Sequence, residues 1–235
     1  MLNAPDKKFM AINAEKQINL KFSALPIKTK KALDFLSKQK WLQNTGWYLA
    51  GGTALALSAG FRRSVDLDFF IQAKDFSNEE LLNNFVNNAD WQTTIDKKNT
   101  IYGELFKAKV SFIAYPFFVP KQKIINYGSV KILAPLDIVV MKIIAISQRG
   151  RKRDFIDLYW CAKNIESLEG SIKKLKIQYP SVAHDYHHIL KALVFFDDAE
   201  SDPMPKMNAK ISWNEVKKFF LKEVPLIMKK IMYLE

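Results

Sequence analysis

The sequence contains a single cysteine, Cys161, and no apolar run that approaches the ~20 residues of a membrane-spanning helix. A lone cysteine excludes a disulfide bond within the chain. Residues 1–17 are polar and lack the apolar segment of a signal peptide. These absences predict a cytoplasmic protein that is not inserted in a membrane.

Histidine and arginine are also scarce. The three histidines, His184, His187 and His188, have helical spacing but no nearby cysteine and no HExxH pattern. A solvated helix face is therefore favoured over a zinc site. All five arginines lie in two short segments, 62–63 and 149–153, although the chain has 36 lysines and arginines together. This placement indicates multidentate recognition of phosphate or carboxylate groups at these two segments.

The chain has 235 residues, of which 49% are hydrophobic, and a net charge of +12. This length allows one large domain or two small ones, with ample material for a core. The positive charge favours a polyanionic partner such as RNA, because clustered cations attract phosphate and release its counterions. Dispersed lysines are also normal on a solvated surface, so charge alone does not assign the partner.

The strongest indication of chemistry begins at a turn of small residues, Gly51-Gly52-Thr53. The turn follows the apolar run 47–50 and precedes a stretch rich in alanine and leucine that predicts a short helix. Backbone N–H groups at such a turn point outward, where a phosphate group can sit. The turn is therefore a candidate nucleotide-binding element, although Gly-Gly-Thr also occurs in ordinary turns.

A strand is predicted after this helix, because polar and apolar residues alternate over residues 64–69. Asp66 and Asp68 share the polar face of this strand, with roughly 7 Å between their Cα atoms. Two carboxylates at this spacing can converge on a hard divalent cation. Arg62 and Ser64 extend the same row. A half-buried edge strand shows the same alternation, so the turn and this row are stronger evidence together than apart.

A second candidate motif combines a lysine in an apolar helix with a basic loop. Lys142 is the only charged residue between Asp137 and Arg149, so its ammonium group must reach solvent or meet an anion. After the basic loop RGRKR, Asp154 and Asp157 lie three residues apart on one helix face. The structural alternative is that Lys142 reaches solvent and Asp154 offsets its basic neighbours at a helix N-terminus.

The order of the predicted elements indicates an α+β fold rather than a regular βαβ repeat. Helices are expected at 28–44 and 77–88, and strands at 47–50, 64–69, 91–95, 100–106, 109–117 and 129–133. Further helices are expected at 136–147, 153–165, 167–178, 182–196 and 213–232, with a linker at 197–211. The predicted elements are mainly strands up to Ala134-Pro135 and helices beyond it. This change predicts an α+β domain over residues 1–134 and a helical domain over residues 135–235 that completes the site.

The two motifs resemble those of a known family. The run GGT followed by RRSVDLDFF is similar to the signature of the nucleotidyltransferase superfamily, a Gly-Gly or Gly-Ser turn followed by Asp-x-Asp. An apolar helix with Met141-Lys142, followed by Arg/Lys-Asp-x-x-Asp-Leu, resembles more narrowly the AbiEii/AbiGii toxins of abortive-infection and toxin–antitoxin systems. The resemblance covers residues 46–205.

This resemblance implies a nucleotidyltransferase-like mixed β-sheet flanked by helices. It implies a Mg²⁺-dependent enzyme that moves NMP from an NTP to a macromolecular acceptor such as RNA, and a toxin restrained by a cognate antitoxin. The implied catalytic residues are Asp66, Asp68, Lys142, Asp154 and Asp157, of which Asp66 and Asp68 bind the Mg²⁺. The nucleotide-binding residues are expected to be Gly51, Gly52, Thr53, Arg62, Ser64 and Lys142.

One position departs from the family pattern. Many nucleotidyltransferases carry a third carboxylate on a later strand, and Ser111 aligns with that position. Glu104 or Asp154 could take its role. If neither does, the chain would be a non-catalytic nucleotide- or RNA-binding module. A metal-dependent phosphohydrolase is the third reading of the same motifs.

Overall fold

The structure is a computed structural model that describes residues 19–232. Its centre is a seven-stranded sheet in the order β3-β4-β5-β2-β1-β7-β6. The strands are β1 (Trp47–Ala50), β2 (Leu67–Ile71), β3 (Trp91–Lys97), β4 (Thr100–Leu105), β5 (Ala108–Ala114), β6 (Ile125–Tyr127) and β7 (Val130–Ile132). The sheet is mixed, since β1 runs antiparallel to β2 and parallel to β7, while β2 and β5 are parallel.

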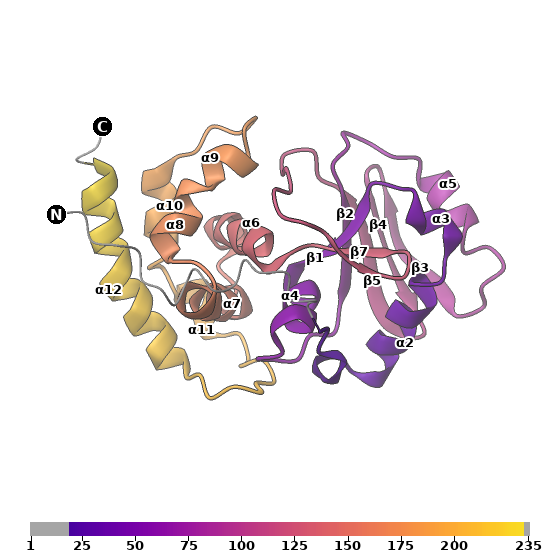
Figure 1. Ribbon diagram of the computed structural model, residues 1–235, viewed down its shortest axis with the longest axis horizontal. Helices are drawn as coiled ribbons and strands as arrows, with labels where there is room; N and C mark the ends of the chain where they lie inside the picture. Colours follow the sequence, from indigo (N-terminus) through magenta and orange to yellow (C-terminus); the bar gives the residue numbers. More distant parts are fainter. Residues whose placement is uncertain (1–18, 233–235) are drawn as a thin grey trace.

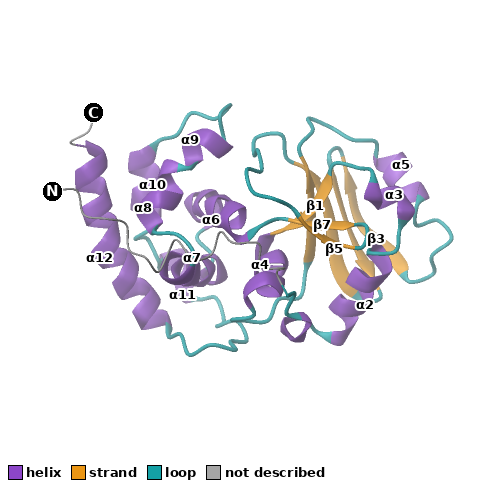
Figure 2. Cartoon of the chain, in the orientation of Figure 1, coloured by secondary structure: helices purple, strands orange, loops and turns teal. Residues whose placement is uncertain are grey.

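Helices flank this sheet and form a second part of the molecule beside it (Figures 1 and 2). The helices of the sheet part are η1 (Phe22–Ala24), α2 (Ile27–Leu36), α3 (Lys40–Gln43), α4 (Gly51–Ala59) and α5 (Asn78–Asn83). The helical part contains α6 (Pro135–Arg149), α7 (Lys152–Asn164), α8 (Leu168–Lys173), α9 (Leu175–Gln178), α10 (Tyr186–Ala192), α11 (Asp197–Glu200) and α12 (Trp213–Met232). The predicted α+β class, with a mixed sheet flanked by helices, is confirmed.

Helix α4 lies between the two parts, with α2, α3 and α5 on the other side of the sheet (Figure 1). It contacts both α6 and α7. One buried hydrophobic cluster runs through both parts and includes Phe69 of β2, Phe112 of β5 and Phe155 of α7. The helical part therefore packs directly onto the sheet part. The division into domains at residues 1–134 and 135–235 stays a prediction.

Two element boundaries in the first part differ from the expected ones for local reasons. The strand expected at 64–69 begins at Leu67, because the N–H of Ser64 bonds to the carbonyl of Ala24 instead of joining the sheet. The helix expected at 28–44 is interrupted after Leu36, where the hydroxyl of Ser37 donates to the carbonyl of Asp34. Residues 40–43 then form the separate helix α3.

Other elements were shorter than expected or were missed. Strand β5 ends at Ala114 rather than at residue 117, and Pro116 beyond it has no N–H to donate to a sheet. The three-residue strand β6 pairs with β7 and was not predicted. The expected helix 167–178 is divided into α8 and α9, and the expected linker contains the short helix α11. None of the helices between residues 19 and 232 has the length and apolar content of a membrane span.

A buried carboxylate connects the two parts next to the site. Asp137, in the first turn of α6, is fully buried. It accepts hydrogen bonds from the N–H groups of Lys121 (3.1 Å) and Gln122 (3.0 Å) and from the side-chain amide of Gln178. Burial raises the pKa of Asp137 above its ordinary value, although these donors oppose the rise. The carboxylate therefore holds the connection between β5 and β6 against α6 and α9.

Replacing Asp137 is expected to destabilise the fold. Asp137→Ala leaves three buried donors without their acceptor, which should lower the free energy of unfolding by about 3 kcal/mol. Urea unfolding followed by circular dichroism measures the loss. Asp75→Ala is the control, because Asp75 is exposed and makes no hydrogen bond or ion pair with residues 19–232. Its expected change is below about 0.5 kcal/mol. Equal effects of the two substitutions would contradict the role of Asp137.

Candidate active site

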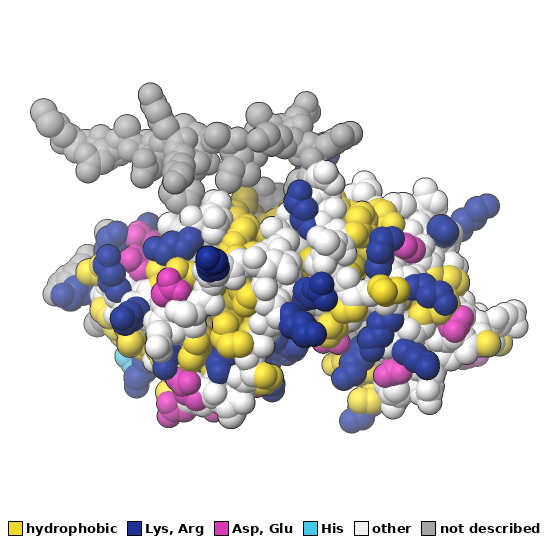
Figure 3. Space-filling view, turned by 90° about the horizontal axis from the view of Figure 1, so that it is seen from below, with side chains coloured by type: hydrophobic (Ala, Val, Ile, Leu, Met, Phe, Trp, Pro, Cys, Tyr) yellow, Lys and Arg dark blue, Asp and Glu magenta, His cyan; other side chains and the backbone are white. Residues whose placement is uncertain are grey.

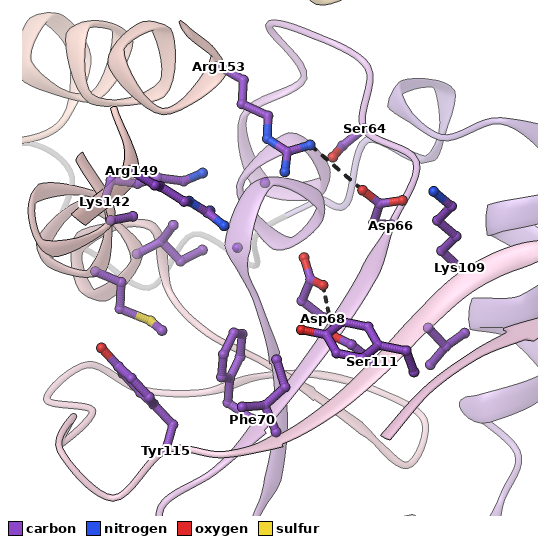
Figure 4. A pocket seen from close by; sticks show the side chains of 18 of the residues that line it. Ser64, Asp66, Asp68, Phe70, Lys109, Ser111, Tyr115, Lys142, Arg149 and Arg153 are labelled. Atoms are coloured by element: carbon purple, nitrogen blue, oxygen red, sulfur yellow. Dashed lines mark hydrogen bonds and ion pairs between the residues drawn. The ribbon is translucent and has the colours of Figure 1, made fainter. Parts of the chain in front are cut away.

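A cleft of about 680 Å³ lies between the sheet and helix α6. Its walls come from the first residues of α4, from β2, β3, β4 and β5, and from one face of α6, with Arg153 of α7 at its edge. Figure 4 shows that Asp66, Asp68, Arg149 and Arg153 face a common space. The cleft therefore brings the first motif and part of the second motif together.

The turn after β1 lies against Asp68. Ala50, the last residue of β1, pairs with Asp68 in the antiparallel register. Gly51 follows with φ +66°, a conformation that glycine adopts without strain. A Cβ at Gly51 would lie 3.2 Å from Oδ2 of Asp68. The missing side chain therefore allows the N-terminus of α4 and the carboxylate of Asp68 to share one wall of the cleft.

The two aspartates of the first motif form the acidic part of the cleft. Asp66 directly precedes β2, and Asp68 lies within it. Oδ1 of Asp68 accepts a hydrogen bond of 2.8 Å from the hydroxyl of Ser111, its register partner on β5. Burial raises the pKa of Asp68, and the charge of Asp66 adds to the rise, while the Ser111 hydrogen bond opposes it. A cation shared by both carboxylates would relieve this unfavourable charge.

The pair has the chemistry that Mg²⁺ requires. Within residues 19–232, no group of three or more His, Cys, Asp and Glu side chains is placed to hold a metal ion. Mg²⁺ commonly keeps several waters and takes one or two carboxylates together with substrate phosphates. Asp66 and Asp68 therefore fit an ion that is shared with a triphosphate. Glu104 lines a different part of the cleft, on β4.

Five charged side chains form a row in which positive and negative charges alternate. They come from the segment after α4 and from helices α6 and α7. Arg62 donates to both oxygens of Asp157, from Nε at 2.5 Å and from Nη2 at 2.7 Å. Nζ of Lys142 lies 2.8 Å from Asp157 and 2.5 Å from Oδ1 of Asp154. Nε of Arg149 lies 3.3 Å from Oδ2 of Asp154. We refer to these five residues as the charge chain.

The inner members of the charge chain are buried. Asp154 and Asp157 are both 0% exposed, and neither is among the described residues that line the cleft. Burial raises the pKa of Asp154, but Lys142 and Arg149 lower it more, so its net shift is downward. Burial lowers the pKa of Lys142, but the two aspartates raise it above its ordinary value. The structure places Asp154 as a counter-ion of Lys142 and Arg149, and Asp157 as a counter-ion of Lys142 and Arg62. Their catalytic roles stay predictions.

Gly52 permits the close approach of Arg62 to the turn. A Cβ at Gly52 would lie 2.5 Å from Nη2 of Arg62 and 3.2 Å from the hydroxyl of Ser64. All three residues line the cleft. Thr53 is placed differently: its side chain is buried, and its hydroxyl donates to the backbone carbonyl of Asp66. Thr53 therefore holds the backbone that carries the first carboxylate, outside the lining of the cleft.

Asp202, just after α11, and the end of α11 contact the basic loop. Asp202 accepts hydrogen bonds from Nε of Arg151 at 2.8 Å and from the N–H of Lys152 at 3.0 Å. Nζ of Lys152 donates to the carbonyl of Glu200 at 3.1 Å. The side chains of Arg149 and Arg153 remain 56% and 48% exposed at the cleft, and Nη1 of Arg153 lies 3.8 Å from Asp66. Two guanidinium groups are thus available to an anion beside the carboxylate pair.

Several lining residues were not predicted from the sequence. They include Phe70, Tyr102, Lys109 and Tyr115. Phe70 continues the period of two that begins with Asp66 and Asp68, so the alternation could have indicated it. The residues of β4 and β5 had no such signal, because only the pairing of β5 with β2 brings them to the cleft.

A Gly-Gly turn and an Asp-x-Asp strand on one mixed sheet define the protein as having a nucleotidyltransferase fold. A protein from H. pylori with a provisional assignment as a nucleotidyltransferase has a similar structure, with a TM-score of 0.51 at 20% identity, covering 92% of this chain and 99% of that chain. MenT4, a nucleotidyltransferase toxin from Mycobacterium tuberculosis H37Rv, gives a TM-score of 0.51 at 14% identity, covering 85% and 86%. At these identities the similarity shows the fold.

The sequence comparison identifies the family. The model of the nucleotidyl transferase AbiEii toxin family, of type IV toxin–antitoxin systems, matches residues 34–112 and 125–231, and the chain belongs to this family. An uncharacterized protein of Aquifex aeolicus (strain VF5) is 33% identical over 185 residues, which cover 76% of this chain and 86% of the relative. The family predicted from the two motifs is confirmed.

Gly52→Ala is expected to act through Arg62. The new Cβ would displace the guanidinium group from Asp157, lowering the free energy of unfolding by about 1–3 kcal/mol. A double-mutant cycle with Arg62→Ala, measured by urea unfolding, tests this mechanism. The effect of Gly52→Ala should largely disappear when Arg62 is already replaced. Fully additive effects would show that Gly52 acts by another route.

Lys142→Met should destabilise the protein strongly, because it leaves two buried carboxylates without their shared cation. The expected loss is about 3–5 kcal/mol of unfolding free energy. Thermal and urea unfolding provide the measurement. Lys191→Met on α10 is the matched control, since Lys191 is exposed and its replacement should change stability by less than about 0.5 kcal/mol. A loss for Lys142→Met as small as that of the control would refute the burial of this charge.

Proposed function

We propose that the protein is a Mg²⁺-dependent nucleotidyltransferase that moves NMP from an NTP onto a macromolecular acceptor, with RNA as the acceptor class. The single observation that carries the proposal is the geometry of one cleft. The carboxylates of Asp66 and Asp68 lie there beside the N-terminus of α4 and across from two exposed arginines. This arrangement supports simultaneous binding of a divalent cation and a triphosphate.

The residues of the cleft divide the binding of the triphosphate between them. The first N–H groups of α4 and the hydroxyl of Ser64 offer hydrogen bonds to phosphate oxygens. Arg149 and Arg153 add positive charge on the opposite side. Lys142 lines the cleft, but its ammonium group is already shared by two carboxylates. We therefore assign Lys142 a weaker contact with phosphate than the two exposed arginines.

The transfer itself requires little covalent chemistry from the protein. The acceptor hydroxyl forms a new bond to the α-phosphorus of the NTP while the bond to pyrophosphate breaks. Mg²⁺, when bound, neutralises charge on the non-bridging oxygens. Ser111 and the turn at Gly51 fix the carboxylate of Asp68, and Thr53 holds the backbone of Asp66, so the pair is positioned before the reaction.

The acceptor class and the antitoxin are parts of the same proposal. A net charge of +12 favours a polyanionic acceptor. Figure 3 shows basic side chains spread over both parts of one face of the molecule, which suits a ligand larger than a nucleotide. Membership of a type IV toxin–antitoxin family supports a cognate antitoxin that restrains the activity.

A non-catalytic nucleotide-binding module is the second candidate function, and Ser111 is the observation that favours it. Ser111 occupies the strand position next to Asp68 where a third carboxylate was expected, and it is 2% exposed. A hydroxyl donates to Asp68 and adds no negative charge for a metal ion. This candidate predicts binding of NTP without turnover.

A labelling assay tests the proposed function. Protein, labelled NTPs, Mg²⁺ and total RNA should give labelled RNA, and removal of Mg²⁺ with a chelator should abolish the label. Asp66→Asn with Asp68→Asn should lower the rate by a factor on the order of 100 or more, because the metal ligands are lost. Asp75→Asn should have no effect, because Asp75 is exposed and is not among the described residues that line the cleft.

The three readings give different outcomes in this assay. A labelled acceptor supports the transferase. Binding of NTP with no product supports the non-catalytic module, and loss of NTP without a labelled acceptor supports a phosphohydrolase. Equal labelling by the double variant and the natural protein would remove Asp66 and Asp68 from the mechanism.

A further inference from the structure

The cleft changes from polar to apolar along its length, and strand β2 shows this change first. Asp66 and Asp68 line its polar end, and Phe70, two residues further on the same face, lines the apolar end. In Figure 4, Phe70 lies close to Tyr115 and away from Asp66, Ser64 and Arg153. The aromatic ring therefore begins where the charged part of the cleft stops.

Strand β5 changes in the same direction, because it is parallel to β2. Ser111 pairs with Asp68, and Ile113 pairs with Phe70. Tyr115 follows two residues later, directly after the end of β5, and all three residues line the cleft. The polar and apolar positions of the two strands are therefore level with each other across the sheet.

Helix α6 forms the facing wall with the same gradient. Ile138, Met141 and Ala145 lie on one helix face and line the cleft, followed by Gln148 and Arg149 at the C-terminal end. Lys142 also lines the cleft, but its ammonium group is paired with Asp154 and Asp157, which lie outside the lining. Ile138 and Arg149 are eleven residues apart, so the face extends for roughly 16 Å. Since Arg149 belongs to the charged end, Ile138 and Met141 belong to the apolar end.

The aromatic rings at the apolar end are held in place. The rings of Phe70 and Tyr115 meet edge to face, with 5.7 Å between their centroids. The hydroxyl of Tyr115 lies 3.3 Å from the hydroxyl of Tyr179, and the N–H of Tyr115 donates to the carbonyl of Ile71 at 2.8 Å. An apolar ligand would therefore meet a preformed surface.

We infer that this apolar end binds the nucleobase of the donor NTP through contacts with the faces of the base. The apolar end consists of Phe70, Ile113, Tyr115, Ile138 and Met141. This inference rests on the proposed function, which places the triphosphate at the carboxylates and arginines. An NTP has the same polarity as the cleft, with charge at one end and an aromatic ring at the other. The roughly 7 Å between Asp68 and Phe70 along β2 leaves room for the ribose.

The part of the cleft formed by β3 and β4, which we call the other branch, suits a base less well. It is lined by Ile95 and Tyr102, which are 41% and 40% exposed, and by the charged side chains of Glu104 and Lys109. The apolar end is more enclosed, since Phe70, Ile113, Tyr115 and Met141 are half-buried there and Ile138 is buried. Stacking gains most where water is excluded, so the donor base favours the end that contains Phe70. The open branch with Tyr102 is left for the acceptor.

Contact with base faces has a consequence for selectivity. Tyr115 carries the only polar side-chain group among the described residues of the apolar end, and that hydroxyl is paired with Tyr179. Strong discrimination between substrates requires buried polar groups that the wrong substrate leaves unpaired, and apolar pockets discriminate weakly. The four NTPs should therefore bind with affinities that differ by less than about tenfold.

Isothermal titration calorimetry in the presence of Mg²⁺ compares the affinities of the protein for the four NTPs and for inorganic triphosphate, which has no base. The natural protein should bind each NTP more tightly than inorganic triphosphate. Phe70→Leu keeps an apolar side chain but removes the ring, and it should weaken NTP binding by about fivefold to tenfold. Its affinity for inorganic triphosphate should be unchanged. Met141→Ala should act in the same direction, and it keeps the test valid if Phe70→Leu lowers the folded fraction.

Tyr102→Leu is the matched control, since it removes a ring from the other branch of the same cleft. Its expected effect on the binding of both ligands is less than twofold. Weakening by Tyr102→Leu, with no effect of Phe70→Leu and Met141→Ala, would move the base to the other branch and overturn the inference. Equal affinity of the natural protein for NTP and inorganic triphosphate would also overturn it. The proposed function fails separately if NTPs bind as expected but no acceptor is labelled.

Discussion

The pairing of buried opposite charges is the interaction on which the site depends. Arg62, Asp157, Lys142 and Asp154 alternate in sign and are at most 5% exposed, so removing one member leaves an uncompensated buried charge. These four residues come from three segments: the one after α4, helix α6 and helix α7. Their attraction therefore fixes the distance between the sheet part and the helical part. The shape of the cleft follows from that distance.

Some charged side chains pair with each other inside the protein, and others face the cleft. A basic protein can therefore present both positive and negative charge at one site. Inside the charge chain, cations and carboxylates neutralise each other. At the cleft, Arg149 and Arg153 remain half exposed, and Asp66 with Asp68 keeps an excess of negative charge. A metal ion with a triphosphate would complement both groups at once. The apolar end beyond Phe70 extends the same complementarity to the uncharged part of a nucleotide.

Local sequence patterns predicted that the glycine turn and the two aspartates lie together, but they mispredicted some of the elements around them. The glycine turn and the two aspartates depend on neighbours within twenty residues, and the structure places them on one wall of the cleft. The start of β2 at Leu67 was mispredicted, because the backbone of Ser64 bonds to Ala24, far away in the chain. Strand β6 was not predicted, because three residues are too few to show an alternation of polar and apolar side chains.

The sequence by itself determined the family, the α+β class and the identity of the turn and the carboxylate row, since these follow from residue type and short-range spacing. Only the tertiary structure decided which charges are used within the protein and which face the cleft. Lys142, Asp154 and Asp157 look equally available in the sequence, but packing of α6 against α7 buries them in mutual ion pairs. Burial depends on contacts between distant segments, and residue spacing along one segment does not report it.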